Sequence, residues 1–117
     1  MTQESRQSLI ELLFLALYLD NHLSLAEDEV LTTALDALGW ESPHPREIFI
    51  FQAFAKAREA ASDAGNTDAF VDSHADLIRR DGTSAPAITW LYKILGADGI
   101  SSSEERFLKK LEKRLFS

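Results

Sequence analysis

Two acidic turns, one near each end of the chain, hold the residues whose types and spacing could do chemistry. The first turn contains Asp20 and leads to Glu27, and the second contains Asp98 and leads to Glu104 and Glu105. Carboxylate oxygens are the ligands that hard cations such as Ca²⁺ and Mg²⁺ prefer. If folding brings the two turns together, these five residues form a site for a divalent cation.

The same turns also have a purely structural interpretation. Each contains the pattern Ser-x-x-Glu, Ser24 with Glu27 and Ser101 with Glu104, which is typical of a helix capping box. An Asp in a turn can likewise accept hydrogen bonds from the amides that follow it. The sequence leaves both interpretations open, although the spacing excludes an EF-hand, whose longer loop needs several alternating acids before its final Glu.

Other potential catalytic or metal-binding groups are sparse. His22 lies inside the first acidic turn, either as a ligand for a softer metal or as an exposed loop residue. We expect His44, between two prolines, and His74, on a predicted helix, to lie on the surface. The chain has no Cys and no nucleophile, zinc-protease or phosphate-loop motif. We therefore do not expect an enzyme.

The composition indicates what kind of chain must position these residues. With 117 residues, 45% of them hydrophobic, residues 1–117 fit one domain with a substantial core. The net charge of −7 argues against a nucleic-acid partner. The longest apolar run, residues 12–19, is too short to span a membrane. The N-terminus also lacks the basic region of a secretory signal, so we expect a cytoplasmic protein.

Helical periodicity and capping signals predict an all-α domain of about six helices. The first is apolar nearly all round and is expected at the centre. Thr67 and Ser84 are the expected N-caps of the fourth and fifth helices. The predicted helices span residues 5–20, 24–39, 46–64, 67–80, 84–96 and 101–116.

The acidic turns belong to a longer internal repeat. The apolar positions before the first turn match those before the second at a constant offset, and those after the turns match at an offset one shorter. We therefore predict two related helix–turn–helix hairpins around a helical middle pair, arranged about a pseudo-twofold axis. The matched positions before the turns are Ile10, Leu13, Phe14 and Leu17 with Ile88, Leu91, Tyr92 and Leu95; those after them are Val30, Leu31, Ala34 and Leu38 with Phe107, Leu108, Leu111 and Leu115.

Aromatic and basic residues suggest where partners could bind. We expect the aromatic residues to line the core. Because Trp90 and Tyr92 fall on different helix faces, the alternative is that one of them is partly exposed and available to a partner. The last helix carries a basic cluster, interpreted either as a solvated face or as a peripheral contact with an anionic membrane. The aromatic residues are Trp40, Phe49, Phe51, Phe54, Trp90 and Tyr92, and the basic ones are Lys109, Lys110, Lys113 and Arg114.

The repeated motif resembles that of the TerB-like family, which is associated with tellurite resistance, and the related domain of DnaJ-like co-chaperones. The matching stretches are residues 95–105 and, with Asn21 where the family has Gly, residues 20–27. The resemblance covers about half of the chain. It implies an all-helical pseudo-twofold domain in a stress-response context, with a metal cation bound by Asp20, Glu27, Asp98 and either Glu104 or Glu105.

These observations together predict a non-enzymatic TerB-like domain that binds a divalent cation, such as Ca²⁺ or Mg²⁺, through its acidic turns. The alternative is a protein–protein interaction module whose acidic turns only cap helices and bind no metal. In both cases we expect a protein partner. The sequence does not specify that partner, the metal or the oligomeric state.

Overall fold

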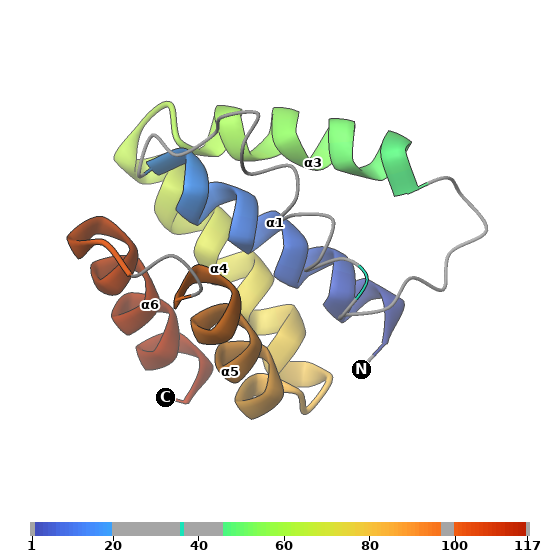
Figure 1. Cartoon of the computed structure of the whole chain (residues 1–117), viewed down its shortest axis with the longest axis vertical. Coiled ribbons are helices and arrows are strands. Elements are labelled where there is room, and N and C mark those ends of the chain that lie inside the picture. The colour runs from blue at the N-terminus through green and yellow to red at the C-terminus, as the bar shows by residue number, and fades with distance from the viewer. Residues whose placement is uncertain (1, 20–35, 37–45, 97–99, 117) are drawn as a thin grey trace.

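The computed structural model describes residues 2–19, 36, 46–96 and 100–116. These residues form five helices and no strand (Figure 1), so the all-α prediction is confirmed. The predicted second helix, residues 24–39, lies outside the described residues except for Asp36. The five helices are α1 (Gln3–Leu19), α3 (Arg46–Ala60), α4 (Ala64–Arg80), α5 (Ser84–Leu95) and α6 (Ser102–Leu115).

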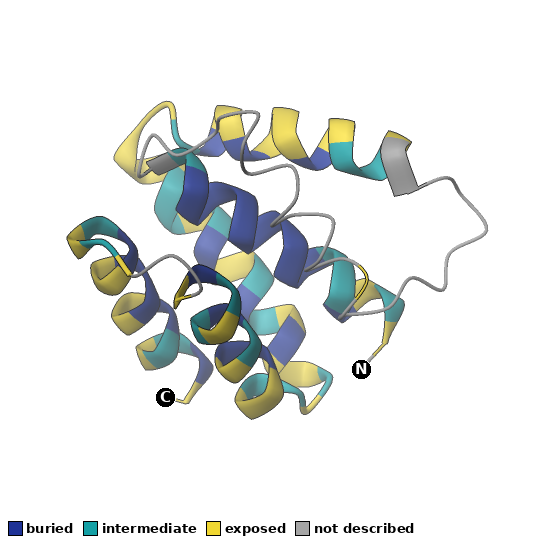
Figure 2. Ribbon diagram, in the orientation of Figure 1, coloured by how far each residue is buried: buried dark blue, intermediate teal, exposed yellow. Residues whose placement is uncertain are grey.

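The central element is α1, as its sequence predicts. Every residue from Ser8 to Leu17 is buried, so no side of this helix faces solvent over that stretch (Figure 2). It contacts α3, α4, α5 and α6. A helix that is apolar all round can be stable only when other helices cover each of its faces, and this requirement sets the arrangement of the remaining elements.

The three C-terminal helices each bury one apolar stripe. In α4 the buried residues are Val71, Ala75 and Ile78, at the spacing of successive helical turns. The predicted core face of α6 is confirmed, since Phe107, Leu108, Leu111 and Leu115 are all buried. The buried residues of α5 are Ala87, Ile88, Leu91 and Leu95.

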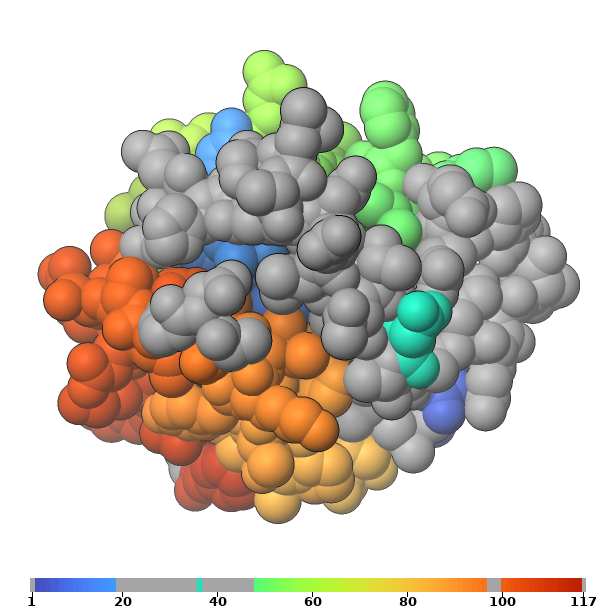
Figure 3. Space-filling view, viewed as in Figure 1, coloured from blue at the N-terminus to red at the C-terminus, as the bar shows by residue number. Residues whose placement is uncertain are grey.

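Helix α3 buries small side chains and exposes several of its large apolar ones. Its buried residues are the small ones, Ala53, Ala57 and Ala60, and they let the helix lie close against α1. The prediction that Phe51 and Phe54 line the core is wrong, because their side chains are 80% and 37% exposed. Side chains of α3 project at the upper edge of the molecule in Figure 3.

Two predicted N-caps are also wrong. Helix α4 begins at Ala64, and its cap is Asp63, whose carboxylate accepts a hydrogen bond from the Asn66 amide at 2.9 Å. Thr67 instead donates its hydroxyl to the carbonyl of Ala60, at 2.7 Å. Ser84 is the first residue of α5, and the cap, Thr83, makes no side-chain capping bond.

A polar tie fixes the start of α1 to the turn between α4 and α5. Asp81 accepts hydrogen bonds from the hydroxyls of Ser5, at 2.6 Å, and Thr2, at 3.1 Å. The bond from Ser5 is the main reason why the pKa of Asp81 lies below its ordinary value. The chain then reverses at Gly82, whose φ of 72° is a left-handed conformation that glycine adopts without strain.

Candidate functional site

Of the five residues predicted to bind a cation, the structure describes only those of the second turn. Asp20, Glu27 and Asp98 lie outside the described residues, so the expected convergence of the two turns stays a prediction. Glu104 is buried in the first turn of α6, whereas Glu105 is exposed and forms an ion pair with Lys109 at 3.0 Å.

The carboxylate of Glu104 belongs to a complete capping box. It accepts a hydrogen bond from the amide of Ser101 at 3.0 Å, and the Ser101 hydroxyl accepts one from the amide of Glu104 at 3.1 Å. The capping prediction is therefore confirmed for the second turn. Within the described part of the chain, no group of three or more His, Asp or Glu side chains gathers closely enough to hold a metal ion.

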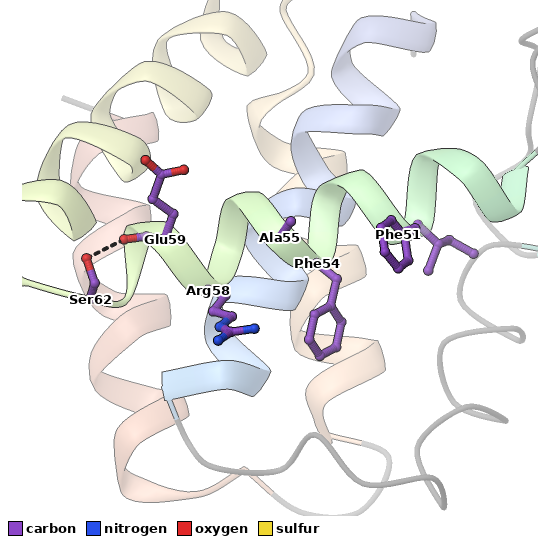
Figure 4. Close-up of a pocket in the computed structure, with 7 residues that line it drawn as sticks. Phe51, Phe54, Ala55, Arg58, Glu59 and Ser62 are labelled. Atoms are coloured by element: carbon purple, nitrogen blue, oxygen red, sulfur yellow. Dashed lines mark hydrogen bonds between the residues drawn. The ribbon is translucent and has the colours of Figure 1, made fainter.

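A row of side chains on the outer side of α3, which we call the α3 outer stripe, was not anticipated as a functional surface. Successive turns of the helix bring its members to one face, opposite the buried alanines. All of its members except Ile48 border an open hollow of about 860 Å³ (Figure 4). The stripe consists of Ile48, Phe51, Phe54, Ala55 and Arg58, all of them exposed.

The apolar members of the stripe differ in how firmly they are held. Phe54 packs its inner edge against α1, with its ring centroid 6.3 Å from that of Phe14 and 6.2 Å from that of Tyr18. Phe51 has no aromatic partner among the described residues. Burying a Phe side chain contributes about 1.5–3 kcal/mol, and most of that stabilisation is forgone at Phe51.

The C-terminal end of the hollow is polar. Arg58 projects to the same side of α3 as Phe54, whereas the carboxylate of Glu59 points to the other side (Figure 4). Ser62 closes this end and donates its hydroxyl to the carbonyl of Glu59 at 2.6 Å. The Arg58 side chain is exposed, and the ion pairs found among the described residues do not involve it.

A second polar feature, also not anticipated, joins α1, α3 and α4. The Glu11 carboxylate, on a residue only 6% exposed, contacts Nε2 of His74 and accepts a hydrogen bond from Nζ of Lys56 at 3.3 Å. The prediction that His74 is a surface residue is wrong, because its ring is largely buried and stacks on Phe70 with centroids 4.0 Å apart. The approach of α4 to α1 encloses it.

The basic cluster of α6 is largely compensated by acidic residues. Lys110 pairs with Asp68 and Arg114 pairs with Asp72, both across to α4, while Lys109 pairs with Glu105 within α6. The hydrogen bond from Lys110 is the main reason why the pKa of Asp68 is below its ordinary value. These pairs favour the solvated-face interpretation of the cluster over a membrane-binding one.

The aromatic residues of α5 are both half-buried. Trp90 and Tyr92 pack against the core with part of each side chain, so both of them, and not one alone, are partly exposed. Burial is the main reason why the pKa of the Tyr92 hydroxyl is raised. Trp40 lies outside the described residues.

Comparison of the chain with protein-family models, with curated proteins and with solved structures finds no match. Among the helices described here, none combines the length and the apolar character needed to cross a bilayer.

Proposed function

We propose that this protein is a non-enzymatic helical interaction module whose α3 outer stripe receives an amphipathic helix of a partner protein. The observation that carries the proposal is the inversion of α3, which packs alanines inward and presents Ile48, Phe51 and Phe54 to solvent. Single exposed apolar residues are ordinary on protein surfaces. A continuous row of large ones beside a hollow is typical of a binding surface.

The shape of the surface favours a helix as the occupant. Ile48, Phe51, Ala55 and Arg58 lie three or four residues apart, so they follow one face of α3 over a length of about 15 Å. Helix-in-groove recognition uses anchors at this repeat on both partners. A partner helix of about three turns would cover the row.

Charge adds an orientation to this contact. The apolar end of the stripe lies at Ile48, and the cationic end lies at Arg58 beside Ser62. An acidic residue at one end of the partner helix would pair with the Arg58 guanidinium, because the planar guanidinium matches the geometry of a carboxylate. We therefore propose an apolar helix with a terminal Glu or Asp.

A designed probe tests this proposal directly. A synthetic amphipathic helical peptide with Leu at helical spacing and a Glu placed to reach Arg58 should bind, and its NMR contacts should map to α3. Phe51→Ala should weaken binding at least about tenfold, as expected for an aromatic anchor. Phe116→Ala is the matched control, because Phe116 is also exposed (57%) but lies at the end of α6.

Two further outcomes would decide against the proposal. Equal losses in the Phe51 and Phe116 variants would mean that the peptide binds nonspecifically to apolar surface. The charge-reversing variant Arg58→Glu is tested with peptides that carry either Glu or Lys at the position facing residue 58. If the variant binds both peptides as the wild type does, the assigned orientation is rejected. Sedimentation of the protein alone reports whether a second copy occupies the stripe instead.

Divalent-cation binding is the second candidate, supported by the duplicated acidic motif of the sequence. Since the Glu104 carboxylate is engaged in its capping box, the proposed ligands are Asp20, Glu27 and Asp98, with Glu105 as the exposed acid of the second turn. The stress-response setting rests on the TerB-like resemblance, and the cytoplasmic location rests on the composition of the sequence. Both remain proposals.

We also propose the six-helix pseudo-twofold arrangement implied by the repeat. Its support is the burial of matched residues: Ile10, Leu13 and Leu17 in α1 are buried, and so are Ile88, Leu91 and Leu95 in α5. The fourth pair, Phe14 and Tyr92, is buried in α1 and half-buried in α5. Equivalent burial is expected if the two hairpins share one ancestral packing.

A further inference from the structure

The imidazole ring of His74 faces a hydrogen-bond acceptor on each side. Nδ1 lies 2.8 Å from the carbonyl oxygen of Phe70, one turn earlier in α4, and Nε2 contacts a carboxylate oxygen of Glu11 in α1. A carbonyl oxygen can only accept, so Nδ1 must carry a proton. The neutral ring has one N–H, and that N–H is therefore already used.

The contact between His74 and Glu11 consequently depends on a further proton. With that proton on Nε2, an imidazolium donates to a carboxylate, which is a charge-assisted hydrogen bond. Without it, the lone pair of Nε2 faces a negatively charged oxygen, and the two atoms repel each other. The protonation of one site thus decides whether the contact attracts or repels.

The contact between Glu11 and His74 lies where α1, α3 and α4 pack together, so it affects the packing of these helices. Glu11 is buried on the face of α1 that α3 and α4 cover, and His74 is largely buried. The other charged groups here are Lys56 of α3, which donates to Glu11, and two acids lining the adjoining hollows, Glu4 of α1 and Glu59 of α3. When His74 is neutral, Lys56 is the remaining cation of this cluster.

We propose that Glu11 and His74 form a pH-responsive latch between α1 and α4, closed when they share a proton and opened when a rise in pH removes it. Free imidazole loses its proton near pH 6.5, which places His among the few residues that titrate within the physiological range. The latch is independent of the partner helix proposed above. Its test therefore needs the protein alone.

At low pH the contact between Glu11 and His74 is lost for a different reason, because the Glu11 carboxylate becomes protonated. Burial by itself would raise the pKa of Glu11, but the hydrogen bond from His74 and the charges of His74 and Lys56 hold it below its ordinary value. A carboxyl group with a lowered pKa stabilises the fold above its unfolded-state value, and this contribution is lost as pH falls through the folded-state value. The latch is thus closed in a pH window whose lower end is the protonation of Glu11 and whose upper end is the loss of the imidazolium proton.

The test follows chemical unfolding and amide hydrogen exchange of the whole chain from about pH 5.5 to about pH 8.5, a range centred on imidazole titration. The unfolding equilibrium constant of the wild type should rise several-fold toward the alkaline end, with faster exchange in α4. Glu11→Gln should flatten this profile, because an amide N–H can donate to the neutral ring. His74→Gln should flatten it too, since its amide donates to Glu11 at every pH.

His44→Gln is the matched control, because it removes another histidine and should leave the wild-type profile intact. A His74→Gln variant that keeps the wild-type pH dependence would overturn the proposal. If that variant does not fold, nitrogen-15 NMR of the wild-type ring decides the question. A ring of His74 with an unprotonated Nε2 at pH about 5.5, well below ordinary imidazole titration, would also overturn it.

Discussion

Glu104 shows how a single residue can be assigned by its hydrogen bonds. One carboxylate oxygen of Glu104 accepts a hydrogen bond from the Ser101 amide, and the residue is buried. Its negative charge also lies at the N-terminal end of α6, where the helix dipole favours it. Its role in the structure is to start a helix.

The capping box predicts the cost of removing the Ser101 hydroxyl. Ser101→Ala leaves the Glu104 amide without its acceptor and should lower the free energy of unfolding by about 0.5–2 kcal/mol. Chemical denaturation measures the change. Ser102→Ala is the control, since Ser102 is the exposed first residue of α6 and should shift the midpoint little. Equal midpoints for the Ser101 variant and the wild type would mean that the box contributes nothing.

Residue pairs that are close in sequence could be identified from the sequence, whereas pairs that are far apart could not. Ser101 and Glu104 are one helical turn apart, so a local pattern reveals them. Glu11 and His74 are 63 positions apart, and nothing in their neighbourhoods connects them. Their pairing exists only because α1 and α4 pack together, and helical periodicity alone does not specify which helices are neighbours.

At the scale of elements, α3 is the helix that departs most from expectation. A rule that places large apolar residues inward assigns its Phe residues to the core. The rule fails because α3 packs against α1, whose buried side chains are mostly large, through small alanine side chains instead. The existence of the helices was easier to predict than where they begin. For α4, Asp63 and Thr67 are both acceptable N-caps, and only the fold selects Asp63.

The alanine seam of α3 predicts an asymmetry between its two faces. Ala57→Leu inserts a larger side chain between α3 and α1 and should destabilise the fold by about 1–3 kcal/mol. Ala55→Leu adds the same atoms on the exposed face and is the control. Thermal melting of both variants checks this. Indistinguishable melting temperatures would indicate that α3 does not pack closely on α1.

For the whole molecule, the distribution of charge matters more than its net value. The chain has a net charge of −7, and residues 1–40 hold seven acids and one base. The opposite end is basic, but Asp68 and Asp72 of α4 neutralise part of α6. Exposed pairs of this kind contribute only about 0–1 kcal/mol each, so we assign them to solubility and not to stability.

The cation proposal is also tested on the whole molecule. Millimolar Ca²⁺ or Mg²⁺ should raise the melting temperature, because an ion that binds only the folded state stabilises it by about 2.7 kcal/mol at a hundredfold excess over its dissociation constant. Asp98→Asn should weaken this response and stabilise the metal-free protein, since it relieves repulsion between carboxylates. Unchanged melting with every divalent ion, or a destabilised Asn variant, would instead support turn capping alone.

The two-sided character of α3 has a consequence for how this protein could change over generations or in a designed library. Its inward face is fixed by the fit of small side chains against α1, whereas Ile48 and Phe51 on its outward face are largely exposed and contribute little to the fold. Substitutions at Ile48 and Phe51 can therefore alter the proposed docking surface at small cost to the scaffold, whereas Phe54 also packs on α1. If the α3 outer stripe binds the partner helix proposed above, recognition and stability are encoded largely on opposite sides of one helix, and each can be selected separately.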